Sequence, residues 1–241
     1  MARINAARFV KVSVLSVLGL ALAFTAFMGF AHTRAGRPLL ALMGRGAHGA
    51  GAGGCPLGLD RAATPAQRAT ARARFAADHR GEGRATARPA LGFRLDETTR
   101  ADVTAWADSH GVTCKKPRSG ADLDCADLPE ALLPDASRGA GVRSLWLTFG
   151  ADDTLVSVVA VRRDASAGVI SAAFRAVTGD LASEAGPAAT VEGDPSAARL
   201  SSGLLQQASA EYRFRDYYAL ARATNMGDGF VLTEEYRSLP D

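Results

Sequence analysis

The first long run of apolar residues extends from Val12 to Ala31 and contains no charged side chain. A helix of this length rises about 30 Å, close to the hydrocarbon thickness of a bilayer. We therefore expect residues 1–31 to form an N-terminal membrane anchor. A signal peptide cleaved after Ala31 and a buried helix of a soluble protein are the alternatives. Basic residues flank the run on both sides, so their count does not decide its orientation.

The next segment, residues 32–63, has no repeating apolar positions. It includes the glycine-rich stretch GRGAHGAGAGGCPLG, a composition typical of a flexible tether. Gly44, Gly46 and Gly49 match the pattern G-x-G-x-x-G. More glycine follows them instead of a helix, so chance composition explains the match better than a dinucleotide site does.

Residues 64–90 are expected to form a basic neck that contains a helix. Thr64 and Pro65 are typical of a helix start, and Gly81 indicates its end. Phe75 is the only large apolar residue of this helix. We therefore expect a solvated helix, with contact to anionic lipid or cell-wall polymer as the alternative.

Periodic apolar positions resume in residues 91–241, which we expect to form one globular domain. Thr99 and Gly111 are typical of the two ends of a helix. Segments rich in β-branched and aromatic residues predict strands on both sides of turns at 150–154 and 225–229. Two more helices are predicted, over 168–185 and 197–208.

Strands that alternate with helices in this way predict an α+β fold, with helices packed on one face of an antiparallel sheet. The same order of helix and strands occurs in residues 96–163 and again in 168–239. This order suggests a tandem helix-plus-hairpin pseudo-repeat, although the residue identities do not repeat.

The distribution of charge separates the N-terminal part from this domain. The 241 residues have a net charge of +3. Residues 1–60 contain six basic residues and one acidic residue, and residues 61–94 contain eight and two. Residues 95–241 contain fourteen basic and twenty-two acidic residues. A basic segment joined to an acidic domain indicates an anionic surface near the basic part, either membrane or nucleic acid.

Two of the three cysteines, Cys114 and Cys125, flank a Pro-Arg-Ser-Gly turn signal. Two strands folded about this turn would place them opposite each other, so we predict a disulfide between them. Two free thiols and a metal site are the alternatives, although a structural zinc site needs four ligands. Cys55 is left over and is expected to be a free or intermolecular thiol.

No catalytic, cofactor-binding or metal-binding residues are assigned. The histidines, His32, His48, His79 and His110, lie in no recognisable nucleophile motif. Neighbouring carboxylates such as Asp152–Asp153 and Glu234–Glu235 point to opposite faces of a strand, and we expect them to be turn residues or solvated. Arg213 and Arg215 are expected on one strand face, which we expect to be a solvated outer face, with a ligand-binding stripe as the alternative.

The stretches LDETTRADVTAWADSHGVTC, FRAVTGDLASEAGPAATVEGD and GFVLTEEYRSL resemble bacterial envelope modules of the SmpA/OmlA type. These modules are related in fold to tandem-repeat β-lactamase-inhibitor proteins. The resemblance covers residues 91–239 and implies an exported, non-catalytic module that binds other proteins. The chain lacks a lipobox cysteine after its apolar run, so lipoprotein anchoring is not implied.

The sequence thus predicts a bacterial envelope protein with a single membrane-spanning helix and its C-terminal domain outside the cytoplasm. If the signal is cleaved, the domain is periplasmic or secreted. Its expected role is protein binding or assembly, without a cofactor, and its expected partners are the membrane and an envelope protein. An exported cell-wall hydrolase and a cytosol-facing binder of nucleic acid or another anionic surface are the alternatives.

Overall fold

The structure is a computed structural model that describes residues 64–117, 122–132 and 140–240, all within one compact unit. The expected anchor and tether lie outside these residues. Of the helices in the described ranges, none is long and apolar enough to cross a membrane.

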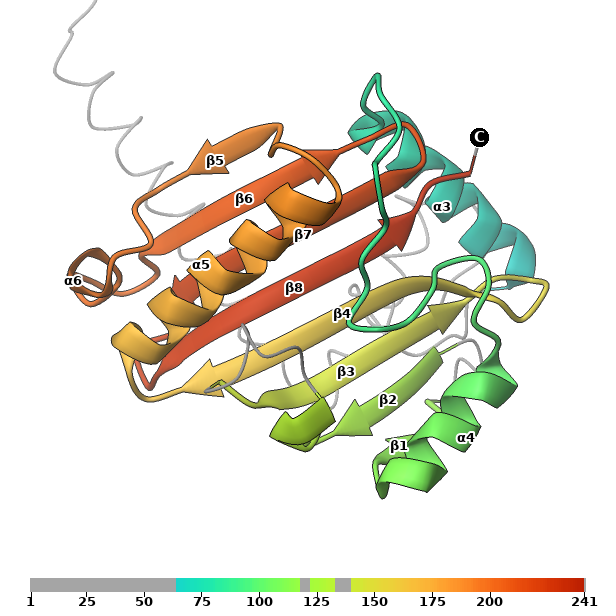
Figure 1. Ribbon diagram of the computed structural model, residues 1–241, viewed down its shortest axis with the longest axis horizontal. Helices are drawn as coiled ribbons and strands as arrows, with labels where there is room; N and C mark the ends of the chain where they lie inside the picture. Colours follow the sequence, from blue (N-terminus) through green and yellow to red (C-terminus); the bar gives the residue numbers. More distant parts are fainter. Residues whose placement is uncertain (1–63, 118–121, 133–139, 241) are drawn as a thin grey trace, which may run out of the picture. The chain divides into compact units, whose positions relative to one another are not determined.

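Eight strands form one antiparallel sheet in the order β1-β2-β3-β4-β8-β7-β6-β5 (Figure 1). The strands are β1 (Thr113–Lys115), β2 (Asp122–Ala126), β3 (Val142–Phe149), β4 (Leu155–Asp164), β5 (Thr190–Glu192), β6 (Gln207–Arg213), β7 (Tyr217–Asn225) and β8 (Phe230–Ser238). The helices are α3 (Pro65–His79), α4 (Arg100–His110), α5 (Ala167–Glu184), α6 (Ala197–Leu200) and the 3-10 helix η1 (Glu130–Leu132). The predicted α+β class with an antiparallel sheet is confirmed. The helix expected over 197–208 is only four residues long.

Each half of the sheet consists of one helix followed by four strands. Helix α4 precedes β1 to β4, and α5 precedes β5 to β8, with the short α6 between β5 and β6. The last strands of the two halves, β4 and β8, pair at the centre of the sheet. The strand order therefore reads alike from both edges towards the centre.

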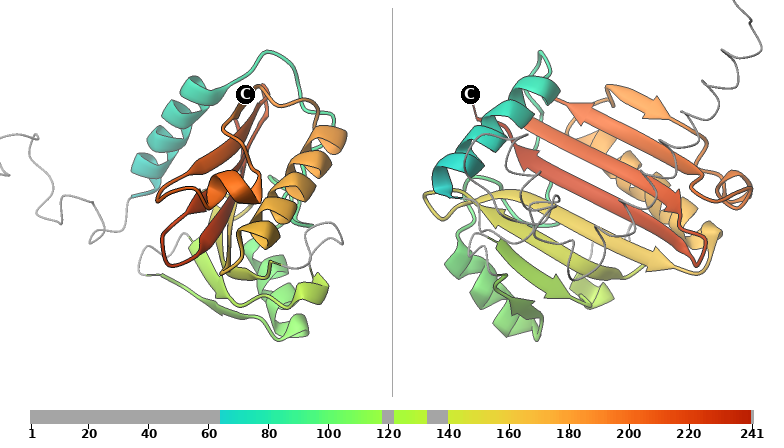
Figure 2. Two further views of the ribbon diagram at one scale, coloured as in Figure 1. Left: turned by 90° about the vertical axis from the view of Figure 1, so that its left-hand side faces the viewer. Right: turned by 180° about the vertical axis from the view of Figure 1, so that it is seen from behind.

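The helices lie on both faces of the sheet, not on one face as expected. Figure 2 shows α3 on one side and α5 on the other. Phe75 and Ala76 of α3 pack against Tyr218, Leu220 and Leu239. The predicted neck helix is therefore docked on the sheet through the one large apolar residue that it contains.

Helix α5 packs on strands with small side chains. Its buried positions include Ile170, Phe174, Val177 and Leu181, at the spacing that the sequence predicted. On β6 and β7 the fully buried positions facing this helix are mostly alanines: Ala208, Ala210, Ala219, Ala221 and Ala223. Large side chains on the helix and small ones on the sheet interdigitate, which allows close packing of the two layers.

A buried ion pair lies where the two halves meet. Arg162 of β4 and Glu234 of β8 have no solvent exposure, and Arg162 Nε donates to Glu234 Oε1. Arg162 Nη1 also donates to the carbonyl oxygen of Ala140 at 2.8 Å, and the Tyr236 hydroxyl donates to Glu234 Oε2 at 2.5 Å. The expectation that Glu234 is solvated is wrong, because strand alternation turns Glu235, and not Glu234, away from the core.

We expect Glu234→Ala to lower the free energy of unfolding by about 3–5 kcal/mol, because it leaves the Arg162 guanidinium buried without its counter-charge. Urea denaturation followed by circular dichroism measures the change. The control is Asp228→Ala, which removes an exposed ion pair with Arg163 at 2.6 Å and should cost less than about 1 kcal/mol. Equal effects of the two variants would contradict the structural role of the buried pair.

Because its tyrosines are buried, we expect the protein to lose stability at alkaline pH. Burial raises the pKa of all four, Tyr212, Tyr217, Tyr218 and Tyr236, with Tyr217 and Tyr236 well above the ordinary range. Above a pH of about 10 the unfolded chain loses phenolic protons that the folded chain keeps. The free energy of unfolding should then fall by up to about 1.4 kcal/mol per pH unit for each tyrosine.

Urea denaturation at stepped pH measures this slope, and ultraviolet absorbance of phenolate reports the ionisation itself. Tyr217→Phe should reduce the slope, since it removes one group whose hydroxyl donates to the carbonyl of Pro89 at 2.6 Å. Titration of the folded protein with the ordinary tyrosine pKa would contradict the burial.

Candidate binding face

One face of β2, β3 and β4 is left uncovered by the described helices. Helices α4 and α5 pack on the other side of the sheet, and α3 packs over β7, the end of β8 and the segment after it (Figure 2). The side chains on this uncovered part include Asp124, Ala126, Trp146, Thr148, Val159 and Val161. We call this surface the Trp146 face.

Trp146 is the most prominent group on this surface, with 45% of its side chain exposed. It pairs with Asp124 of β2 on one side and with Val159 of β4 on the other. Single exposed apolar side chains are common on protein surfaces, but this tryptophan lies on the same sheet face as the half-buried Val159 and Val161 and so forms part of an apolar patch. The face thus combines an aromatic centre with apolar strand residues and an acidic neighbour.

Trp146 was not predicted to be a binding residue, although its position in the alternating pattern of the strand marks it as exposed. In VRSLWLTF, Val142, Leu145 and Leu147 are buried, while Ser144 and Trp146 lie on the opposite face. A strand alternating between an apolar and a polar face therefore has a tryptophan at a polar position.

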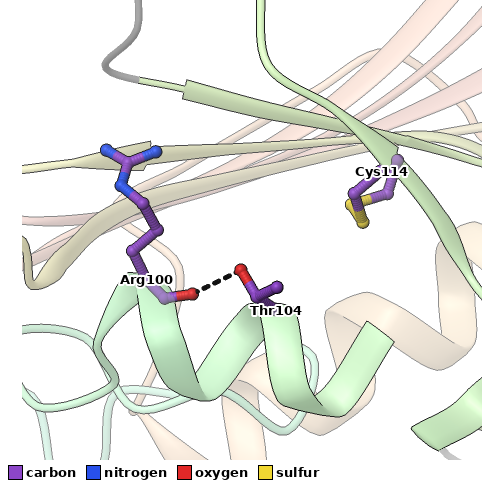
Figure 3. The surroundings of a disulfide bond; sticks show 4 residues. Arg100, Thr104 and Cys114 are labelled. Atoms are coloured by element: carbon purple, nitrogen blue, oxygen red, sulfur yellow. Dashed lines mark hydrogen bonds between the residues drawn. A yellow bond between two sulfur atoms is a disulfide. The ribbon is translucent and has the colours of Figure 1, made fainter. Parts of the chain in front are cut away.

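A disulfide holds the hairpin at the edge of this face. The structure places Cys114 of β1 directly opposite Cys125 of β2, and their sulfur atoms are bonded. Figure 3 shows the bond on the side that faces α4, where Arg100 and Thr104 lie. Cys125 is fully buried and pairs with Leu145. The disulfide therefore fastens β1 to the same strand that places Asp124 beside Trp146.

His110 does not form a catalytic arrangement with the groups around it. Its Nδ1 lies 2.8 Å from the carbonyl oxygen of Trp106 and 2.9 Å from Ser109 Oγ. The Ser109 hydroxyl donates to the same carbonyl. Both side chains are exposed at the C-terminal end of α4, where a histidine also interacts favourably with the helix dipole.

The acidic turn residues also have structural roles. Asp152 accepts hydrogen bonds from the Thr154 hydroxyl and amide, which lower the pKa of its carboxyl group. Asp153 has a positive φ of 63° and pairs with Arg100 at 2.8 Å. The expectation that these residues belong to a turn is confirmed.

The remaining candidate groups are not brought together. His79 packs against Phe75 and Tyr218 beneath α3. Arg213 is exposed and pairs with Glu211 on β6, whereas Arg215 is exposed in the turn beyond the strand, so the two do not share a strand face and the alternative of a ligand-binding stripe does not form. In the described ranges, no group of three or more metal-ligating side chains occurs. His32, His48 and Cys55 lie outside those ranges.

Comparison with known proteins adds no relative to this picture. No protein-family model matches the sequence, and neither a curated protein nor a solved structure matches it.

We expect a Cys55→Ser protein, purified from its native compartment and denatured, to bind no alkylating agent before reduction and two equivalents after it. Mass spectrometry of the intact chain measures this. Replacing Cys114 and Cys125 by serine should lower the free energy of unfolding by roughly 3 kcal/mol, because the short loop is no longer closed in the unfolded state. Two alkylated thiols without reductant would contradict the disulfide.

Proposed function

We propose that this chain is a membrane-tethered, non-catalytic module of the bacterial envelope that binds another protein through the Trp146 face. The observation that supports this most strongly is the exposed tryptophan at the centre of a sheet surface that the described helices do not cover. Tryptophan is enriched among the residues that contribute most to protein–protein binding, because it buries a large rigid surface at a small entropic cost.

The surroundings of Trp146 suit an interface of this kind. Val159 and Val161 extend the apolar centre, while Thr148 and Asp124 provide polar groups at its margin. Protein interfaces commonly have an apolar, aromatic centre and a polar rim. The sheet supports this surface from behind through a continuous core.

Location outside the cytoplasm is supported by the disulfide, because such bonds persist in oxidising compartments. The apolar run of residues 12–31 supports a tether, and the basic charge that follows it suits an anionic membrane surface. Repetition of one helix and four strands in each half is consistent with the resemblance to tandem-repeat envelope modules. We therefore place the domain on the outer side of the cytoplasmic membrane.

Site-specific photo-cross-linking in intact cells tests this function. A photoreactive phenylalanine analogue at position 146 should give one discrete cross-linked protein band in the membrane fraction, because the partner lies against this face. The matched control is position 108, where Asp108 is exposed on the outer side of α4, and it should not give that band. A membrane-impermeant maleimide should label Cys55 in the same cells.

Identical bands from positions 146 and 108, or no band from either, would contradict binding through the Trp146 face. Labelling of Cys55 only after the cells are lysed would contradict the proposed topology. An overproduced copy without the photoreactive residue should compete for the partner and weaken the cross-linked band. The same copy with Trp146→Ala should not compete, while its thermal unfolding remains cooperative.

A further inference from the structure

A second apolar surface lies at one end of the sheet, away from the Trp146 face. Five large apolar side chains are exposed in the described ranges, and three of them gather here. Leu204 and Leu205 precede β6, and Met226 follows β7; their exposed fractions are 66%, 63% and 49%. Leu204 reaches the turn after β7, since a Cβ on Gly227 would lie 2.9 Å from Leu204 Cδ1. We call Leu204, Leu205 and Met226 the apolar tip.

Two backbone amides of the apolar tip are hydrogen-bonded within the protein. Asn225 is buried, and its Nδ2 donates to the carbonyls of Leu200 and Gly203 at 2.9 and 3.0 Å. The amide of Leu205 donates to the carbonyl of Asn225, and the amide of Met226 donates to that of Gly229. Polar backbone groups that are paired in this way can enter an apolar medium without a large desolvation penalty.

Leu205 is exposed and also occupies an unfavourable backbone conformation. Its φ is 59°, in the left-handed region that leucine seldom adopts. A glycine at this position would avoid the strain. Residues held in sparsely populated backbone conformations cluster at functional sites and ligand contacts.

The three side chains of the tip are uncharged, and most of the residues beside them in sequence are uncharged as well. Residues 200–207 and 223–227 contain no acidic or basic residue. Asp228 belongs to the same turn as Met226 and is exposed, and it pairs with the exposed Arg163 at 2.6 Å. The tip thus presents long, exposed aliphatic side chains beside one exposed ion pair, which suits penetration of a fluid interface by the aliphatic groups.

The tip and the N-terminal connection lie at opposite ends of the sheet (Figure 1). Arg72 of α3 donates to Ser238, which pairs with Tyr217, whereas the tip adjoins Asn225 at the other end of β7. The nine residues of β7 separate the ends by roughly 27 Å. The 32 residues from 32 to 63 can span up to about 105 Å, so an anchored chain is long enough for the tip to reach the membrane.

We propose that the apolar tip inserts into the surface of the lipid bilayer to which the chain is tethered. The inference rests on the proposed membrane tether, which keeps the tip near lipid. It requires no anionic headgroup, because the tip has no basic residues. Insertion would hold the strands of the domain end-on to the membrane and leave the Trp146 face directed to the side.

Fluorescence quenching in proteoliposomes tests the inference. The full chain with Cys55→Ser and Met226→Cys, labelled with an environment-sensitive dye at position 226, is reconstituted into neutral phosphatidylcholine vesicles. We expect blue-shifted emission and quenching by spin-labelled lipid, both unchanged in high salt. The same dye at position 108, with Asp108→Cys in place of Met226→Cys, should show neither effect.

Leu205→Gly provides the decisive variant. It removes one side chain of the tip and relieves the strained φ, so the thermal unfolding temperature should stay the same or rise. Each methylene group returned to water weakens partitioning by about fourfold, so the variant should lower the docked-to-free ratio at least about tenfold. A decrease in quenching of this size, without a loss of stability, would support insertion.

The possible failures are distinguishable. Chain that leaves the vesicles in an alkaline carbonate wash would overturn the tether and with it the basis of the inference. Chain that stays with the vesicles but is not quenched at position 226 would overturn insertion alone. Blue-shifted emission that is not quenched by spin-labelled lipid, and that increases with the density of protein in the vesicles, would mean that the tip binds another copy of the chain. This result too would overturn insertion.

Discussion

The whole sheet depends on the pairing of β4 with β8 at its centre. This pairing joins two sets of one helix and four strands into one continuous layer. The buried Arg162–Glu234 pair lies on the helix-covered side of the junction, with Tyr236 and the carbonyl of Ala140 completing its hydrogen bonds. A shift of one residue in register would turn Glu234 outward and leave Arg162 in the core without its counter-charge, at a high energetic cost.

This junction also determines which surfaces remain open. Because α5 packs over the centre and the β5–β8 half, and α4 lies near the disulfide hairpin, the covered side is a continuous core. On the reverse side α3 packs over β7, the end of β8 and the chain end after it. The reverse side of β2 to β4 therefore keeps an exposed tryptophan, which a longer or differently placed neck helix would have buried.

The Trp146 face and the apolar tip differ in the physical chemistry that they offer. The Trp146 face is broad, rigid and built on neighbouring strands, with a carboxylate beside its aromatic centre, as suits a protein surface of defined shape. The tip is small and consists of aliphatic side chains, and its strained leucine suits a surrounding medium that adapts to it. Both are supported by tightly packed elements, so neither needs rearrangement of the core in order to bind.

Much of this architecture follows from the chain alone. The caps at Thr99 and Gly111, the spacing of apolar residues in α5 and the turn signals around Asp153 are local, and local rules of helix and turn formation predict them. The cysteine spacing likewise allowed the hairpin and its disulfide to be expected. Pairing over long distances decided the rest: that Glu234 is buried while Glu235 is not, that five alanines form the floor beneath α5, that α3 packs on the sheet, and that Leu204 and Met226 meet. These features depend on which strands become neighbours, and no short-range pattern in the sequence contains that information.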